Sequence, residues 1–138
     1  MMKFVFSLVL ALCFCGSVNA QTIQDRNFST VGYAQDGRIQ NGSYSTIANI
    51  ESDGTVKDGS YCIIGYIKSD GTVQNRSFST IGHIRSDGTV QDGSYCTLGY
   101  VKSDGTVQDR SFSIVGYARG VKVNYAALFF FFLQKMKS

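Results

Sequence analysis

The sequence from residue 66 to residue 82 is Tyr66-Ile67-Lys68-Ser69-Asp70-Gly71-Thr72-Val73-Gln74-Asn75-Arg76-Ser77-Phe78-Ser79-Thr80-Ile81-Gly82, one copy of a unit that fills most of the chain. The glycine of an Asp-Gly pair recurs every 17 residues, at Gly37, Gly54, Gly71, Gly88 and Gly105. An aromatic residue recurs after one step of 16 residues and then four steps of 17, at Phe28, Tyr44, Tyr61, Phe78, Tyr95 and Phe112. This fixed period predicts a repeat architecture with one supersecondary unit per copy.

Each copy has the composition of a β-hairpin, because β-branched and aromatic residues flank the turn-forming segment Ser69-Asp70-Gly71. A two-residue Asp-Gly turn would place Lys68 opposite Val73, whereas a three-residue loop would place Ile67 opposite Val73. We predict the three-residue loop, since register follows the apolar pattern. The repeated turn glycine would then have a positive φ, which glycine adopts without strain.

Residues 1–20 have the pattern of a secretory signal peptide. Lys3 supplies the positive charge, residues 4–15 form an apolar core, and Val18-Asn19-Ala20 fits a cleavage site. The apolar core is too short to span a bilayer as a helix. We therefore expect a single β-hairpin-repeat domain at residues 21–138 that is secreted, periplasmic or displayed at the cell surface, with no transmembrane segment after cleavage.

The composition excludes several classes of function. The net charge is +3, from 13 Lys and Arg against 10 Asp and Glu, and the bases form no cluster, so nucleic acid is not an expected partner. No His/Cys cluster offers zinc ligands, and no glycine-rich loop precedes a helix to bind phosphate. We expect no metal and no cofactor.

Cys62 and Cys96 occupy one repeat position, which holds Ser45, Ser79 and Ser113 in other copies. In an open stack of hairpins the two cysteines would be four strand spacings apart, roughly 19 Å at about 4.8 Å per strand. A disulfide requires Cα atoms within about 7 Å, which a position close to a closing axis alone could provide. We expect no disulfide and two buried free thiols.

The two ends of the repeat region are complementary halves. Residues 22–26 match the second strand of a unit, and residues 112–118 match the first strand. Such half-units can complete each other and close the sheet, which removes exposed edges. We therefore predict an all-β fold, a closed radial array of about five hairpins, with the aromatic ends of the strands buried. A second repeated glycine should let an aromatic ring or a neighbouring backbone approach closely, at Gly32, Gly65, Gly82, Gly99 and Gly116.

The C-terminal segment breaks the period. Arg119-Gly120 replaces Ser-Asp-Gly and begins an altered hairpin, and residues 126–133 then have the sequence Ala-Ala-Leu-Phe-Phe-Phe-Phe-Leu. Such an apolar run without alternation is typical of a strand buried on both faces, and it is too short for a membrane helix. We expect this apolar C-terminal strand to seal the core.

The unit at residues 103–113, Ser-Asp-Gly-Thr-Val-Gln-Asp-Arg-Ser-Phe-Ser, is followed by Tyr117-Ala118-Arg119-Gly120-Val121-Lys122 and a Phe-rich end. Over essentially residues 21–133, this pattern resembles the five-fold β-flower proteins, secreted repeat proteins typical of Bacteroidota. The resemblance implies hairpins arranged radially. It implies no activity and no catalytic residue.

One repeated column offers a candidate binding surface, at Tyr33, Tyr66, His83, Tyr100 and Tyr117. His83, the only histidine, occupies a tyrosine position, so we interpret it as a drifted repeat residue rather than a catalytic base. Exposed rings in this column could bind a glycan or a cell-envelope protein. Rings packed between repeats would instead be part of a scaffold.

The other candidates are paired aspartates, Asp53 with Asp58, Asp87 with Asp92 and Asp104 with Asp109. Two carboxylates across a hairpin turn provide too few of the about six to eight oxygens that calcium requires. A hydrolase would need a pair about 5–10 Å apart, and a catalytic site should break a repeat rather than recur in it. We therefore predict an exported non-enzymatic structural or binding module, with an exported hydrolase that uses a carboxylate pair as the alternative.

Overall fold

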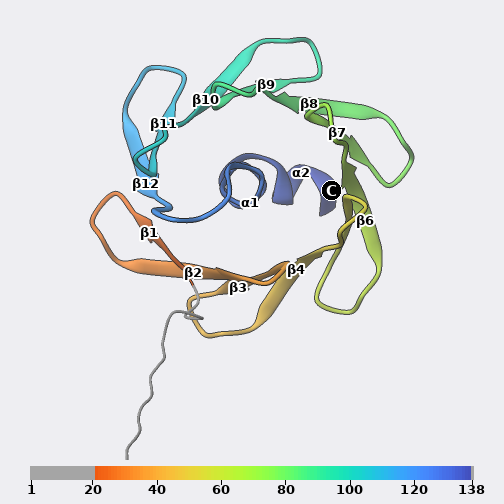
Figure 1. Ribbon diagram of the computed structural model, residues 1–138, viewed down its shortest axis with the longest axis horizontal. Coiled ribbons are helices and arrows are strands. Elements are labelled where there is room, and N and C mark those ends of the chain that lie inside the picture. Colours follow the sequence, from red (N-terminus) through yellow and green to blue (C-terminus); the bar gives the residue numbers. More distant parts are fainter. Residues whose placement is uncertain (1–20, 138) are drawn as a thin grey trace, which may run out of the picture.

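The computed structural model describes residues 21–137, which form a closed barrel of antiparallel strands around a central helix (Figure 1). The strands are β1 (Gln21–Asp25), β2 (Thr30–Gln35), β3 (Arg38–Asn41), β4 (Thr46–Ile50), β5 (Thr55–Lys57), β6 (Ile63–Ile67), β7 (Thr72–Asn75), β8 (Thr80–Ile84), β9 (Thr89–Asp92), β10 (Thr97–Val101), β11 (Thr106–Asp109) and β12 (Ile114–Tyr117). The helix consists of α1 (Val123–Ala127), the π-helical segment η2 (Leu128–Phe132) and α2 (Leu133–Lys137). The signal peptide expected at residues 1–20 lies outside the described residues.

The barrel closes because β1 pairs with β12, which places Gln24 opposite Tyr117 and Asp25 opposite Gly116. All other pairs join strands that follow each other in sequence, so no described strand has a free edge. This confirms the predicted closed radial array and the joining of the two half-units. In the described residues, five hairpins form around the five Asp-Gly turns, and β12 pairs with β1 as a sixth pair where the barrel closes.

The β6–β7 turn shows how the repeated turn glycine is used. Ile67 lies opposite Val73, which is the predicted register. Gly71 has a φ of 91°, and its N–H donates to the carbonyl oxygen of Lys68 at 2.9 Å. A Cβ atom at Gly71 would also collide with the carbonyl oxygen of Ile84, so both the backbone conformation and the space require glycine.

The β2–β3 turn departs from this pattern. Gln35 pairs with Arg38, which leaves the two-residue turn Asp36-Gly37. Both turn residues have positive φ, 50° at Asp36 and 82° at Gly37, as a two-residue hairpin turn requires. The missing residue accounts for the single 16-residue step in the period.

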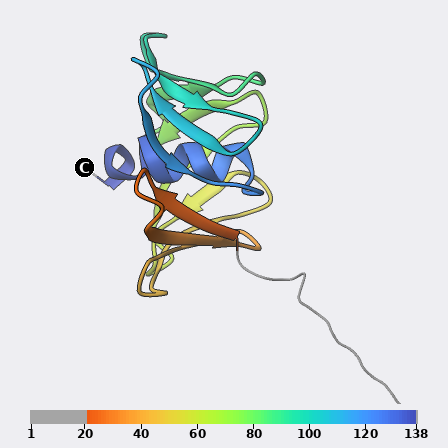
Figure 2. The same cartoon turned by 90° about the vertical axis from the view of Figure 1, so that its left-hand side faces the viewer.

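The core lies between the barrel wall and the helix, which runs along the barrel axis (Figure 2). Inward-facing side chains of the strands are fully buried, at Ile23, Ile39, Val56, Val73, Val90 and Val107. Leu128 and Phe132 of the helix are fully buried against them. Within the described residues, no helix combines the length and the apolar character that crossing a membrane requires.

The prediction of a buried C-terminal strand is wrong, because residues 123–137 are helical. Every strand of the closed barrel already has two partners, so a segment inside the barrel finds no strand with which to pair. A helix satisfies its own backbone N–H and C=O groups in that position. An apolar run without alternation also suits a helix that is surrounded by core on all sides.

The second repeated glycine marks where the helix touches the barrel wall. Phe129 faces Gly32, Phe130 faces Gly116, Phe131 faces Gly99, Phe132 faces Gly82 and Met136 faces Gly65. A Cβ atom at Gly32 would lie 2.7 Å from both Phe129 Cε2 and the carbonyl oxygen of Gln40, which confirms the predicted close approach of a ring and a backbone. Consecutive phenylalanines thus reach consecutive hairpins. The π-helical segment helps, because an i→i+5 turn rotates less per residue than the about 100° of an α-helix, and neighbouring hairpins are separated by a smaller angle.

Candidate ligand-binding surface

Six turns in the described residues carry the repeated aromatic residue, at the end of the barrel opposite the Asp-Gly turns. In the β7–β8 turn, the side-chain oxygen of Asn75 accepts the backbone N–H groups of Ser77 at 2.9 Å and Ser79 at 3.0 Å. The N–H of Phe78 donates to the carbonyl oxygen of Asn75 at 3.0 Å. The side-chain contacts recur in the other turns, at Asp25, Asn41, Asp58, Asp92 and Asp109. Each turn is therefore held by one polar side chain that satisfies two backbone donors.

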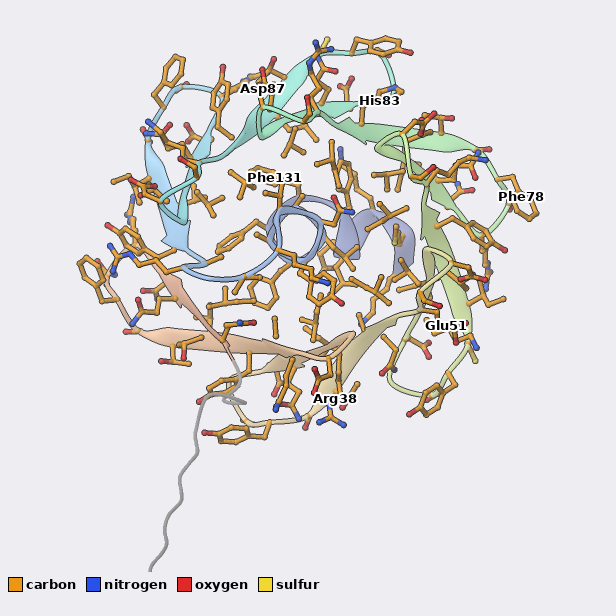
Figure 3. All side chains as sticks on the ribbon, in the orientation of Figure 1. Arg38, Glu51, Phe78, His83, Asp87 and Phe131 are labelled. Atoms are coloured by element: carbon orange, nitrogen blue, oxygen red, sulfur yellow. The ribbon has the colours of Figure 1, made fainter. Side chains whose placement is uncertain are left out.

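The aromatic residue of each turn has a left-handed backbone, with φ between 64° and 68°. This conformation costs a bulky residue about 1–3 kcal/mol. The six side chains are exposed, from 56% at Phe28 to 69% at Tyr61, and Figure 3 shows Phe78 pointing outward from its lobe. The prediction that the aromatic ends are buried is therefore wrong, because these residues lie in turns and not within strands.

Five of the six exposed rings stack on the column that the sequence singled out. Phe28 stacks on Tyr117, Tyr44 on Tyr33, Phe78 on Tyr66, Tyr95 on His83 and Phe112 on Tyr100, with ring centroids 4.2–4.9 Å apart. Each column residue is half-buried as a result. Its ring is therefore neither fully exposed, as a binding surface would require, nor fully packed between repeats, as a scaffold would require. The column residues are not brought together, since each lies on a different hairpin. The sequence interpretation did not include the turn ring of each pair among the site residues, although the regular recurrence of that aromatic residue could be read from the sequence.

Two members of the column show how closely the stacks resemble each other. His83 lies 4.2 Å from Tyr95 between ring centroids, in the same arrangement as the tyrosines. At Tyr33, a side-chain hydrogen bond with Tyr44 raises the pKa of the Tyr33 hydroxyl above its usual value. Because its ring stacks on a turn ring as the tyrosine rings do, His83 acts as one more ring of the column.

Tyr61 is the exception among the six turn residues. The column position beside it is Asn49, whose Nδ2 donates to the carbonyl oxygen of Asp58 at 3.2 Å. No ring in the described part of the chain stacks on Tyr61, and it is the most exposed of the six. Its φ is still 64°, so this turn keeps a strained aromatic residue without the stack that compensates elsewhere.

The aspartate pairs lie at opposite ends of a strand, and not across a hairpin turn as the sequence indicated. Asp92 is the last residue of β9 and Asp87 lies two residues before its first, so the two are roughly 16 Å apart at about 3.3 Å per residue. That separation exceeds the about 5–10 Å of a hydrolytic carboxylate pair. Each carboxylate serves its own turn, since Asp87 accepts the N–H of Thr89 at 2.9 Å and Asp92 accepts the N–H of Ser94 at 2.8 Å.

These turn hydrogen bonds also keep the carboxyl groups ionised. The backbone N–H of Thr72 lowers the pKa of Asp70 below its usual value, and the equivalent threonines lower the pKa values of Asp53, Asp87 and Asp104. The N–H of Cys96 is the main cause of the lowered pKa of Asp92. Among the described residues, no group of three or more His, Cys, Asp or Glu side chains could hold a metal ion.

Cys62 and Cys96 are free, and both residues are exposed. Each follows the aromatic residue of a turn and donates its backbone N–H to the turn aspartate at 3.0 Å, Cys62 to Asp58 and Cys96 to Asp92. The expectation of buried thiols is wrong, because this position belongs to the exit of a turn rather than to a strand face.

An open cavity of about 800 Å³ lies at the other end of the barrel, between the Asp-Gly turns and the start of the helix at Lys122–Tyr125. Its charged lining has both signs, including Asp53, Asp70, Lys68 and Arg85. Tyr125 is the one aromatic residue among the described residues of this lining, whereas the turns at the opposite end present six exposed rings. The aromatic turns therefore remain the better candidate for a binding surface.

The family model described as "5-fold beta-flower protein" matches residues 16–134. Searches of curated proteins and of solved structures gave no significant match. The matched region spans the whole barrel and most of the helix.

Proposed function

The chain belongs to the 5-fold β-flower protein family, and from this premise we propose that it is an exported, non-enzymatic binding module for saccharides. The binding surface consists of the aromatic residues of the six turns together with the polar side chains that hold those turns. Each hairpin of the barrel presents one such ring. The barrel and its central helix serve as the rigid support.

Tyr61 is the observation that carries this proposal. If the turn rings served only to cover the column residues, the turn beside Asn49 would have no need of an aromatic residue. Tyr61 nevertheless keeps its ring, at 69% exposure and with a positive φ. Strained, exposed residues of this kind are more often retained for a function than for stability.

The chemistry of the turns favours a sugar. Binding sites for small ligands combine aromatic faces with a few polar groups that fix orientation. Here a serine or cysteine directly follows each turn aromatic, and the aspartate or asparagine that holds the turn lies three residues before it. Because the turn hydrogen bonds already fix the backbone, little conformational entropy is lost when a ligand stacks on the ring.

Export is supported by the N-terminal pattern of a charged residue, an apolar core and a small-residue cleavage site at residues 1–20. An exported protein meets the glycans of the cell envelope or of its surroundings, whether it is secreted, periplasmic or displayed at the surface. This location fits a saccharide ligand and excludes cytosolic nucleic acid.

The test is a titration of the purified protein with a panel of soluble polysaccharides, followed by calorimetry and by the fluorescence of the turn tyrosines. We expect at least one saccharide to bind and to quench this fluorescence, and Phe78→Ala to weaken the binding. Ser77→Ala is the matched control, since Ser77 contributes its backbone N–H to the same turn. Binding that survives Phe78→Ala and its counterparts in the other turns would refute the proposal. If the same rings bind a cell-envelope protein instead, the ligand is a protein and the assignment to saccharides is refuted.

A further inference from the structure

The hairpin β3–β4 and the neighbouring strand β5 depart from the repeat at four outward positions. Arg38 stands where other units have Thr22, Thr55, Thr72, Thr89 and Thr106. Lys57 stands where they have Gln24, Gln40, Gln74, Gln91 and Gln108. Glu51 stands where one unit has Gln35 and the others have a basic residue, at Lys68, Arg85, Lys102 and Arg119. Asn49 replaces the column ring.

The four positions are neighbours on one face of the barrel wall. Asn49 lies opposite Arg38 of β3 on one side and opposite Lys57 of β5 on the other. Side chains at directly opposed positions of antiparallel strands lie on the same face. Glu51 belongs to the same group, because it forms an ion pair with Lys57. The departures are therefore concentrated in one sector of an otherwise regular wall.

The ion pair determines which charge is available in this sector. Lys57 is neutralised by Glu51, whereas Arg38 is exposed and has no acidic partner in the described part of the chain. Figure 3 shows Arg38 on the outer side of the barrel, in contrast to Phe131 inside it. The sector thus presents one guanidinium group to a ligand, and a guanidinium matches the two oxygens of a carboxylate.

Tyr61 supplies a flat surface in the same sector. In the other units a column ring covers the turn ring with centroids 4.2–4.9 Å apart. Here the column residue is the shorter Asn49, whose side chain is held by the carbonyl oxygen of Asp58. Asn49 still has an acceptor oxygen and a second N–H hydrogen for hydroxyl groups.

We propose that the outer face of β3, β4 and β5 is a binding site for a sugar residue that carries a carboxylate. Its pyranose ring stacks on Tyr61 where the other units have a column ring. The amide of Asn49 binds its hydroxyl groups, and Arg38 binds its carboxylate through paired N–H donors. This inference rests on the proposed function and deepens it, because it names the ligand class for one of the six turns.

The experiment compares two probes that differ in charge, trigalacturonic acid and galactotriose, on the ¹⁵N-labelled protein. Amide chemical shifts locate each probe, and calorimetry gives its affinity. Arg38→Thr restores the residue of the other units and should lower the affinity for trigalacturonic acid about tenfold, with no change for galactotriose. Asn49→Tyr restores the column ring and should reduce the shifts at residues 38–61 to the size of those in the other turns. Phe78→Ala removes the turn ring of another unit, and it should leave the amide shifts at residues 38–61 unchanged.

The outcomes separate this inference from the proposed function. If both probes shift all six turns alike and neither Arg38→Thr nor Asn49→Tyr has an effect, the binding module stands and the acidic-sugar site is refuted. If trigalacturonic acid shifts residues 38–61 alone, the site stands and the wider binding surface is refuted. The absence of shifts with either probe refutes the site. The melting temperature of Asn49→Tyr checks that a loss of binding is not a loss of fold.

Discussion

Phe28, in the first turn, stacks on Tyr117, in the last strand, with ring centroids 4.6 Å apart and ring planes 10° apart. The guanidinium of Arg119 lies 5.0 Å from the Tyr117 ring centroid. These contacts lie beside the pairing of Gln24 with Tyr117, where β1 and β12 close the barrel. The stack therefore joins the first and the last part of the barrel wall, and it gives the first turn ring a role in closure.

Replacing Phe28 by alanine should loosen this closure. An aromatic pair contributes about 0.5–1.5 kcal/mol beyond its area burial, so the free energy of unfolding should fall by about 1 kcal/mol. Amide hydrogen exchange should become faster in β1 and β12. Tyr44→Ala is the matched control, because it removes the stack on Tyr33, which joins neighbouring parts of the sequence rather than the closing strands. It should lower stability to a similar extent without affecting exchange in β1 and β12, and equal exchange in the two variants would contradict the closing role.

The contact between Gly82 and the central helix leaves no space for a methyl group. A Cβ atom there would collide with the ring of Phe132 and would lie 2.6 Å from the carbonyl oxygen of Gln91. Overpacking of this kind costs about 1–3 kcal/mol, so Gly82→Ala should lower the melting temperature clearly. Gly42→Ala is the control, since its nearest contact would be the carbonyl oxygen of Thr30 at 3.3 Å. A Gly82→Ala protein as stable as wild type would show that the helix does not pack where we place it.

Stability should fall in acid because of the Ser-Asp-Gly turns. The pKa values of Asp53, Asp70, Asp87 and Asp104 are lowered, each chiefly by a backbone N–H. A lowered folded-state pKa contributes stability that is present above the unfolded value of about 3.9 and is lost as the pH falls through the folded value. Asparagine can accept the same bond without titrating, as Asn41 and Asn75 do in the aromatic turns.

The quadruple variant with asparagine at these positions should thus have a flatter stability profile in acid than wild type. Urea denaturation at a series of pH values measures it. Wild type should exceed the variant in stability most near neutral pH, where all four carboxylates are ionised, and this difference should shrink as the pH falls through their lowered pKa values. If the free energy of unfolding of the variant falls in acid as steeply as that of wild type, these turns do not cause the loss of stability.

The strained backbone of Tyr61 should lower the free energy of unfolding of the wild-type protein. Glycine adopts its positive φ without strain, so Tyr61→Gly should leave the free energy of unfolding unchanged or raise it by up to about 1 kcal/mol. Tyr95→Gly relieves the same strain but loses the stack on His83. It should therefore be about 1 kcal/mol less stable than Tyr61→Gly. If Tyr61→Gly is the less stable variant, Tyr61 has a structural role that we have not assigned.

The sequence predicted the parts of the fold that depend on local pattern. The opposition of Ile67 and Val73, the need for glycine at Gly71 and the closure by β1 all follow from the repeat. The helix at residues 123–137 does not, because an apolar run fits a buried strand and a buried helix equally well. What decides between them is that the closed barrel offers no free edge, which is a property of the whole molecule.

The candidate site was predicted in part for a similar reason. The column ring Tyr66 was recognised from its position, but its partner Phe78 was assigned to a buried strand end. Composition cannot show that Phe78 has a positive φ, because aromatic residues avoid this conformation in general. The turn is imposed by Asn75, whose side chain accepts two backbone N–H groups. An aspartate or asparagine three residues before each aromatic was the available signal.

The most direct test replaces all six turn aromatics by glycine and measures saccharide binding together with the melting temperature. Our account predicts that the barrel still folds, since relief of six strained residues offsets the loss of five stacks, and that binding is abolished. A variant that binds saccharide as wild type does would contradict the account. So would a variant that fails to fold, because the rings would then be parts of the scaffold.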